Sequence, residues 1–191
     1  MPKPKDENKT RQIHEATLRL VIQNGFAGLK MAEVAKATGI ATGTLYIYYP
    51  GKEELINGLY VETKMEIISV LLDTGHQDVN VYKTIRNLWF AYFSFCFHNP
   101  QKMMFVEQFL YSGLVSKANL DMTESKMAPF NQFLASAMDQ GVIRFMDIEI
   151  LKAHIQGSLH EIVKLLHKES KSVTVKDKEL FFELMWNSIR K

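Results

Sequence analysis

Residues 30–55 read KMAEVAKATGIATGTLYIYYPGKEEL, and this stretch decides the fold. Its first part predicts a short helix whose apolar face contains the small Ala35, over which another helix can cross closely. Gly39 stands where that helix should stop, and glycine takes the required positive φ without a steric cost. Thr42 suits the N-cap of a second short helix, which Pro50 and the following glycine end. Two short helices joined by a tight turn are typical of a helix-turn-helix.

The second of these helices and the residues after it carry a more specific series. Gly-Thr-Leu-Tyr at 43–46, a tyrosine pair at 48–49 and Lys-Glu-Glu-Leu at 52–55 follow one another. This series resembles the DNA-binding motif of the TetR family of bacterial repressors, with Tyr49 in place of the usual Phe. The resemblance is sharp over residues 10–60, and beyond them it rests on helix number and length alone.

The chain as a whole is predicted to be all-α, because apolar residues recur at helical spacing and no convincing strand run appears. The resemblance implies a three-helix helix-turn-helix head, the DNA-binding domain, over residues 1–51. It also implies a helical ligand-binding and dimerisation domain over residues 52–191, with about nine helices in all. One helix is predicted from Leu120 to Gln140, with a kink at Pro129.

The composition of the 191 residues is that of an ordinary globular protein, with 47% hydrophobic and 23% charged residues. The single cysteine, Cys96, excludes a disulfide within the chain and favours a reducing compartment. The N-terminus lacks the apolar core of a signal peptide, and the longest apolar run, around Leu88 to Phe97, is too broken to span a bilayer. We therefore expect a cytoplasmic protein with no membrane partner. The net charge of +2 lies entirely in residues 1–58, which agrees with nucleic-acid binding without establishing it.

A helix that reads DNA presents small or hydrogen-bonding side chains to base edges and anchors itself by contacts to phosphates. Carried over position by position from the family motif, the expected contacts to double-stranded DNA are Thr42, Gly43, Thr44, Tyr46, Ile47, Tyr48 and Lys52. Lys30 is added to these contacts because its side chain can reach a phosphate. Gly43 would let the backbone approach DNA closely, and Lys52 at the start of the next helix would favour a phosphate. Leu45 is expected in the core instead.

The tyrosines have an alternative interpretation, in which they only pack the small head. We prefer packing for Tyr49, since the family Phe at this position is a core residue, and DNA contact for Tyr46 and Tyr48. The chain also departs from the family at the start of the first motif helix, where Ser or Thr is common and this sequence has Leu29-Lys30. Lys30 can reach a phosphate, but the hydroxyl cap is missing.

Aromatic side chains and methionines are dense from residue 89 onward. An aromatic stripe at helical spacing is core more often than ligand site, and part of this one must be core. The resemblance implies a ligand cavity in the helical domain, suited to a small apolar or aromatic effector. The candidates for its wall are Trp89, Tyr92, Phe93, Cys96, Phe105, Phe109, Met122, Met127, Phe130 and His154.

The last two long helices, the first of which opens at Asp147, are expected to form a homodimer interface. Their apolar stripes include Leu151 and Leu159 on one helix and Met185 and Trp186 on the other. A two-fold dimer would match a palindromic DNA site. The alternative is that one of the stripes covers the core of a single chain, and such packing accounts for part of both stripes.

Motifs for catalysis do not occur in the sequence, which has no HExxH, phosphate loop or nucleophile elbow. We expect no enzyme, no metal and no cofactor. The predicted function is a ligand-responsive DNA-binding transcriptional regulator, a repressor released from a palindromic operator by its effector. The alternative is a co-regulator or protein–protein module of the same fold that does not bind DNA, and the missing cap at Lys30 is its only support.

Overall fold

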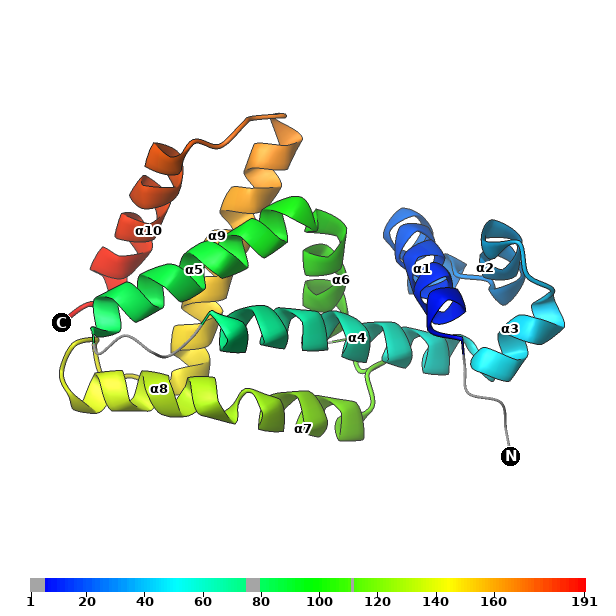
Figure 1. Cartoon of the computed structure of the whole chain (residues 1–191), viewed down its shortest axis with the longest axis horizontal. Coiled ribbons are helices and arrows are strands. Elements are labelled where there is room, and N and C mark those ends of the chain that lie inside the picture. Colours follow the sequence, from blue (N-terminus) through cyan, green and yellow to red (C-terminus); the bar gives the residue numbers. More distant parts are fainter. Residues whose placement is uncertain (1–5, 75–79, 111) are drawn as a thin grey trace. The chain divides into compact units, whose positions relative to one another are not determined.

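Ten helices make up the computed structural model within residues 6–74, 80–110 and 112–191, which are the residues that the structure describes (Figure 1). They are α1 (Glu7–Gly28), α2 (Met31–Thr38), α3 (Thr42–Tyr48), α4 (Lys52–Asp73), α5 (Val81–His98), α6 (Pro100–Leu110), α7 (Lys117–Lys126), α8 (Ala128–Asp139), α9 (Ile148–Lys168) and α10 (Val175–Ile189). In this part of the chain the β-type pairing is limited to an isolated bridge between Ile143 and Arg190. The all-α prediction is confirmed.

The helix predicted from Leu120 to Gln140 is in fact two helices, α7 and α8, so that ten helices replace the nine expected. Met127 is the N-cap of α8, and Pro129 lies in the first turn of α8. A proline lacks a backbone N–H, but the first helical turn has no acceptor for that N–H in any case. Pro129 therefore belongs to the start of a helix here rather than to a kink in one.

The chain folds into two compact units. The first unit contains the residues up to Met65 together with 101–123, and the second contains 66–100 together with 124–191. α4 begins in the first unit and ends in the second. The functional boundary expected after Gly51 stays a prediction.

In the first unit, α1, α2 and α3 close around a small apolar core. Asp6 caps α1, where its carboxylate accepts hydrogen bonds from the N–H groups of Asn8 and Lys9. Gly25 interrupts α1 with φ of 68° and ψ of 174°, a conformation that a side chain would strain. The core positions are Ile13, Ala16, Val21, Val34, Ala35 and Leu45, all buried.

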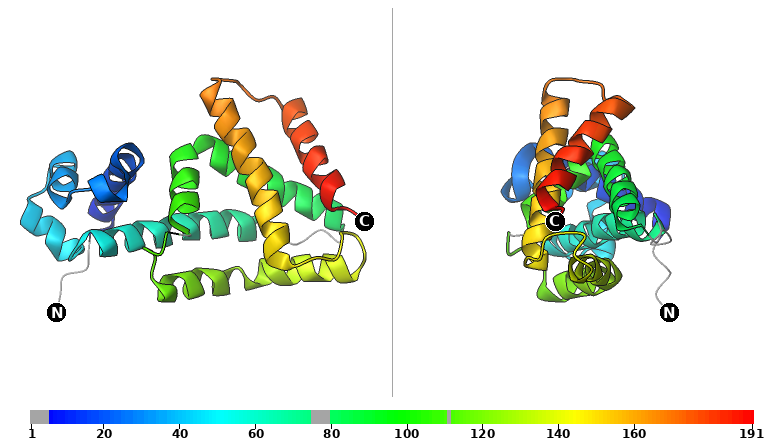
Figure 2. Two further views of the ribbon diagram at one scale, coloured as in Figure 1. Left: turned by 180° about the vertical axis from the view of Figure 1, so that it is seen from behind. Right: turned by 90° about the vertical axis from the view of Figure 1, so that its left-hand side faces the viewer.

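In the second unit, α5 packs against both α9 and α10, and α9 and α10 lie side by side (Figure 2). Aromatic rings fill the space between them: Phe93 is fully buried, and Trp89 stacks on it with the ring centroids 5.1 Å apart. Asp147 caps α9 as predicted, by accepting hydrogen bonds from two backbone N–H groups of the first turn. A capping box between Thr174 and Asp177 starts α10.

Candidate nucleic-acid interface and ligand cavity

The turn between α2 and α3 has the geometry that its sequence predicted. Gly39 adopts φ of 68° and ψ of 20°, and the next N–H, from Ile40, donates to the carbonyl of Ala35 at 3.1 Å. Ala35 is 1% exposed, so its small side chain lies within the packing of the two helices. Ala41 rather than Thr42 is the N-cap of α3, and Thr42 is its first helical residue. The prediction that Thr42 is the N-cap is therefore wrong by one residue. The helix begins here without a side-chain cap, and helix boundaries derived from sequence often differ by one or two residues.

One face of α3 is open to solvent. Thr42 and Gly43 are exposed, and one turn later Tyr46 is 49% and Ile47 is 76% exposed. A Cβ placed on Gly43 would meet no other described atom within 4 Å, so packing within the chain does not require glycine there. Thr44 is half-buried, and Leu45 is fully buried, which confirms the core position predicted for Leu45. The exposed face thus collects the predicted contacts of α3 other than Thr44 and Tyr48.

The three tyrosines near the end of α3 differ in their surroundings. Tyr48 is only 9% exposed, and its hydroxyl accepts a hydrogen bond from the N–H of Asp6 at 3.3 Å. This burial favours the alternative in which Tyr48 packs the head, and its contact with DNA stays a prediction. The side chain of Tyr46, by contrast, projects to solvent. Tyr49 is 9% exposed and lies against His14, with its hydroxyl 2.6 Å from Nε2, as the packing interpretation predicts.

Two predicted lysine contacts lie at helix starts. Lys30 is the N-cap of α2 and forms no side-chain cap, which confirms that the hydroxyl cap is missing. Its ammonium is 3.4 Å from Glu33, and the side chain is 72% exposed, so this ion pair is weak and leaves Lys30 accessible to an anion. Lys52 is the first residue of α4, and its ammonium lies over the ring of Phe26, 4.4 Å from the centroid.

A buried polar network, which the sequence reasoning missed, joins α1, the end of α3 and α4 within the first unit. His14 is 5% exposed, its Nδ1 pairs with the carboxylate of Glu62, and its Nε2 meets the Tyr49 hydroxyl. Burial, reinforced by the charge of Glu62, raises the pKa of Tyr49 to about 12, and the hydrogen bond with His14 lowers the pKa of Glu62. A Cβ on Gly58 would lie 2.9 Å from the Tyr49 ring and 3.3 Å from His14, so any larger residue at this position of α4 would force these buried side chains to shift.

The second unit contains an apolar cavity of about 40 Å³. Its walls are Leu71, Leu88, Trp89, Tyr92, Phe130, Lys152, Ile155 and Gln156. Three of the predicted wall residues, Trp89, Tyr92 and Phe130, are among them. Leu71 belongs to α4 and Phe130 to α8, so the cavity lies where several helices of this unit meet.

The other predicted wall residues lie elsewhere. Phe93, Cys96 and Met127 are buried in the same unit without lining the cavity, and burial raises the pKa of the Cys96 thiol to about 12. His154 is exposed on α9 and is hydrogen-bonded to Ser188 at 2.7 Å, so it does not line the cavity.

Phe105, Phe109 and Met122 belong to the first unit, where the Phe109 ring lies 6.3 Å from that of Phe26. The aromatic density that suggested one continuous wall is thus divided between two separate cores. These three residues do not line the cavity of the second unit, so the cavity does not support their prediction as ligand contacts.

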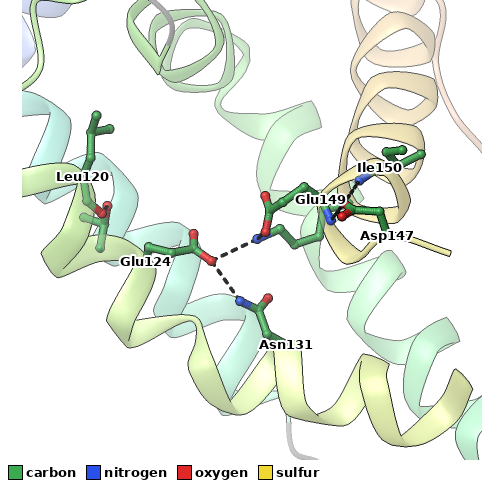
Figure 3. Close-up of polar contacts among 8 residues, drawn as sticks. Leu120, Glu124, Asn131, Asp147, Glu149 and Ile150 are labelled. Atoms are coloured by element: carbon green, nitrogen blue, oxygen red, sulfur yellow. Dashed lines mark hydrogen bonds and ion pairs between the residues drawn. The ribbon is translucent and has the colours of Figure 1, made fainter. Parts of the chain in front are cut away.

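Lys152 is the charged residue of the cavity wall, and no sequence pattern predicted it. Its ammonium lies 3.0 Å from Glu124 and 2.7 Å from Glu149, and Glu124 also accepts a hydrogen bond from Asn131 (Figure 3). Burial by itself would lower the pKa of Lys152, but the hydrogen bonds to Glu149 and Glu124 raise it. Lys152 is therefore a cation at neutral pH.

The apolar stripes predicted for the dimer interface are largely buried within the single chain. Leu151, Leu159, Met185 and Trp186 are 0–7% exposed, which agrees with the alternative that packing within the single chain accounts for part of both stripes. A different set of apolar side chains on α9 and α10 faces solvent. These are Ile150, Leu165, Val175, Leu180 and Leu184, all more than half exposed.

No helix among the described residues is both long and apolar enough to cross a membrane. Within the same residues, no group of three or more His, Cys, Asp or Glu side chains could hold a metal ion.

Comparison with known proteins assigns both parts of the chain to one family. Residues 13–59 match the family described as "Bacterial regulatory proteins, tetR family", and residues 81–190 match "Tetracyclin repressor-like, C-terminal domain". The HTH-type transcriptional regulator BetI 1 of Chromohalobacter salexigens is 28% identical over 127 residues, which are 56% of this chain and 63% of that relative. The chain thus spans less than two thirds of this curated relative.

Solved structures share the fold over nearly the whole chain. A TetR family transcription regulator from Marinobacter aquaeolei VT8 has a TM-score of 0.90 and 24% identity, with 98% of each chain covered. The transcriptional regulator FadR from Bacillus subtilis, solved in complex with stearoyl-CoA, has a TM-score of 0.74 and 18% identity, with 94% of this chain and 99% of that one covered. Because the match to residues 81–190 alone covers more than half of the sequence, the chain belongs to the TetR family of bacterial regulatory proteins.

Proposed function

We propose that this protein is a dimeric, ligand-responsive repressor that binds a palindromic DNA operator through α3. The observation that carries the proposal is the exposed face of α3, on which Thr42, Gly43, Tyr46 and Ile47 face solvent together. Gly43 has no packing reason to be glycine, and a close approach by a DNA backbone supplies one. In a major groove, hydroxyl groups can form hydrogen bonds with base edges and phosphates, and methyl groups can contact the methyl group of thymine.

The proposed response to ligand depends on α4. Leu71 near its C-terminal end lines the cavity, and Gly58 and Glu62 earlier in the same helix contact the network of His14 and Tyr49. A ligand that enlarges the cavity displaces Leu71 and so changes the tilt of α4. In a dimer, the two recognition helices must enter successive major grooves about 34–36 Å apart, and a change of tilt alters that spacing. DNA is then released.

The proposed dimer forms through α9 and α10. The five exposed apolar residues on these helices support a four-helix interface between two chains, because such a surface is costly to leave in water. They are Ile150, Leu165, Val175, Leu180 and Leu184. The effector is proposed to be a small molecule that enters the cavity, and the same fold in Bacillus subtilis FadR holds stearoyl-CoA.

A co-regulator that does not bind DNA is the second candidate. Lys30 leaves α2 without a side-chain cap, which weakens one end of the helix-turn-helix. A weakened cap costs about 1 kcal/mol of helix stability and does not remove the exposed face of α3.

Selection of duplexes from a random-sequence library separates the two candidates. We expect enrichment of a palindrome, followed by a gel-shift affinity that falls steeply with salt because phosphates are neutralised. Absence of any enriched duplex and a salt-independent background would contradict the proposal and favour the co-regulator.

Two matched tyrosine variants refine the test on the selected duplex. Tyr46→Phe removes an exposed hydroxyl and should weaken DNA binding without changing the thermal midpoint, because that hydroxyl faces solvent. Tyr48→Phe removes the acceptor for the Asp6 N–H and should lower the thermal midpoint more than the affinity of the folded protein. The reverse pattern would mean that Tyr48 is the contact.

A further inference from the structure

The cavity of the second unit has a lysine in a mostly apolar wall, in which Gln156 is a further polar side chain, and this combination restricts what the cavity can bind. The Lys152 side chain is only 11% exposed, and a cation buried to this extent needs partners. Its partners here, Glu124 and Glu149, do not line the cavity, and their side chains are 56% and 66% exposed. A carboxylate with that exposure is readily solvated by water, so its contact with Lys152 can be exchanged at little cost.

A second donor is carried by a residue of the same wall. Trp89 is 3% exposed, and its indole N–H is buried and has no hydrogen-bond partner among the described residues. A buried donor without a partner is unfavourable, and an acceptor supplied by a ligand relieves that cost. Both a cation and an unsatisfied N–H therefore favour a ligand that carries oxygen acceptors and a negative charge.

The rest of the wall favours an apolar body. Leu71, Leu88, Phe130 and Ile155 offer hydrocarbon surface, and the Tyr92 hydroxyl is already engaged with His160 Nε2 at 2.7 Å. The volume of about 40 Å³ is smaller than such a body, so the cavity must enlarge when it is occupied. The wall can yield at Phe130 and Ile155, which are half-buried, whereas Leu88 is almost fully buried.

We propose that the effector is an amphipathic monocarboxylate. Its carboxylate takes the place of a glutamate on the Lys152 ammonium, and its hydrocarbon part occupies the enlarged apolar cavity. This inference rests on the proposed function in taking this cavity as the effector site, and it adds the chemical class of the effector.

Three probes with one hydrocarbon body and different head groups test the inference. Decanoate, decanol and decylammonium are titrated into the full chain by calorimetry, below their aggregation concentrations. Decanoate should bind about tenfold or more tightly than decanol, because a charge-assisted hydrogen bond replaces a neutral one, and decylammonium should bind least. Equal affinity for decanoate and decanol, or tightest binding of decylammonium, would overturn the inference.

Variants of the ion-pair cluster assign the preference to Lys152. Lys152→Met should reduce decanoate binding to the level of decanol, whereas Lys152→Arg should retain the preference. Glu149→Gln should strengthen decanoate binding and leave decanol unchanged, because it removes a competing carboxylate from the ammonium. A preference for decanoate that survives in Lys152→Met, with the variant's thermal midpoint unchanged, would refute the role of Lys152. If Lys152→Met does not fold, the three-probe series and Glu149→Gln decide the matter.

Failure of this inference is distinguishable from failure of the proposed function. Equal binding of decanol would refute the carboxylate and leave an apolar effector in place. If none of the three probes binds, the inference is overturned, while duplex selection with the same preparation tests DNA binding by itself.

Discussion

The substitution Gly43→Ala should separate DNA binding from folding. The added Cβ meets no described atom within 4 Å, and Gly43 lies inside α3, so alanine fits the existing backbone. Alanine is favoured over glycine in helix interiors by about 1 kcal/mol, and near a helix start the gain is smaller. For a chain of 191 residues, this gain corresponds to a thermal midpoint raised by at most about 2–4 °C.

DNA affinity should move in the opposite direction. The methyl group lies on the exposed face of α3, where it holds the backbone away from a phosphate or base edge. Loss of one hydrogen bond to a charged phosphate costs about 1.5–3 kcal/mol, which is about a tenfold to hundredfold weaker affinity.

The assay is fluorescence anisotropy with the selected duplex, paired with a thermal melt of the same preparation. Gln23→Ala, at an exposed position of α1, is the control and should change neither quantity. An affinity for DNA within about twofold of wild type for Gly43→Ala would refute the reasoning, because the glycine would then serve no close approach.

Three further predictions concern stability, chemistry and assembly. The hydrogen bond with His14 lowers the pKa of Glu62 in the folded state, so the stability that this hydrogen bond contributes is present above the ordinary carboxyl pKa and is lost as pH falls through the folded pKa. Glu62→Gln should make the free energy of unfolding, measured by urea titration at acid pH, less dependent on pH. A pH profile of stability unchanged from wild type would contradict this prediction. The thiol of Cys96, with a pKa raised to about 12 by burial, should react with a thiol reagent only after unfolding in urea, whereas rapid labelling of the native protein would show that it is accessible. Leu184→Asp should convert the proposed dimer to monomers in sedimentation experiments, and Phe145→Ser, at an 85% exposed position outside α9 and α10, should not. A Leu184→Asp variant that is still dimeric would place the interface elsewhere.

The parts of the structure that sequence could predict depend on residues close to one another in the chain. Gly39 defines its turn through its own φ, Leu45 is buried because of the period of its helix, and Asp147 caps the N–H groups that follow it directly. Pro129 shows where this local reasoning fails, because a proline in an apolar helical pattern is compatible with both a kink and a helix start.

The cavity and the polar network depend on long-range contacts and could not be predicted in the same way. His14 and Glu62 are 48 positions apart, and Lys152 meets Glu124 across 28 positions. Aromatic density suggested Trp89 and Tyr92, which do line the cavity, but it could not show that Phe109 packs in a different core. A prediction from helical period identifies which side chains are buried, not which of them share a space.

The lack of a side chain at Gly58 has a mechanical consequence. The Tyr49 ring rests against the bare backbone of α4, and His14 and Glu62 fasten the same turn to α1. A rotation of α4 about its axis would press the side chains beside Gly58 against that ring. We therefore expect the end of α3 to move together with this part of α4.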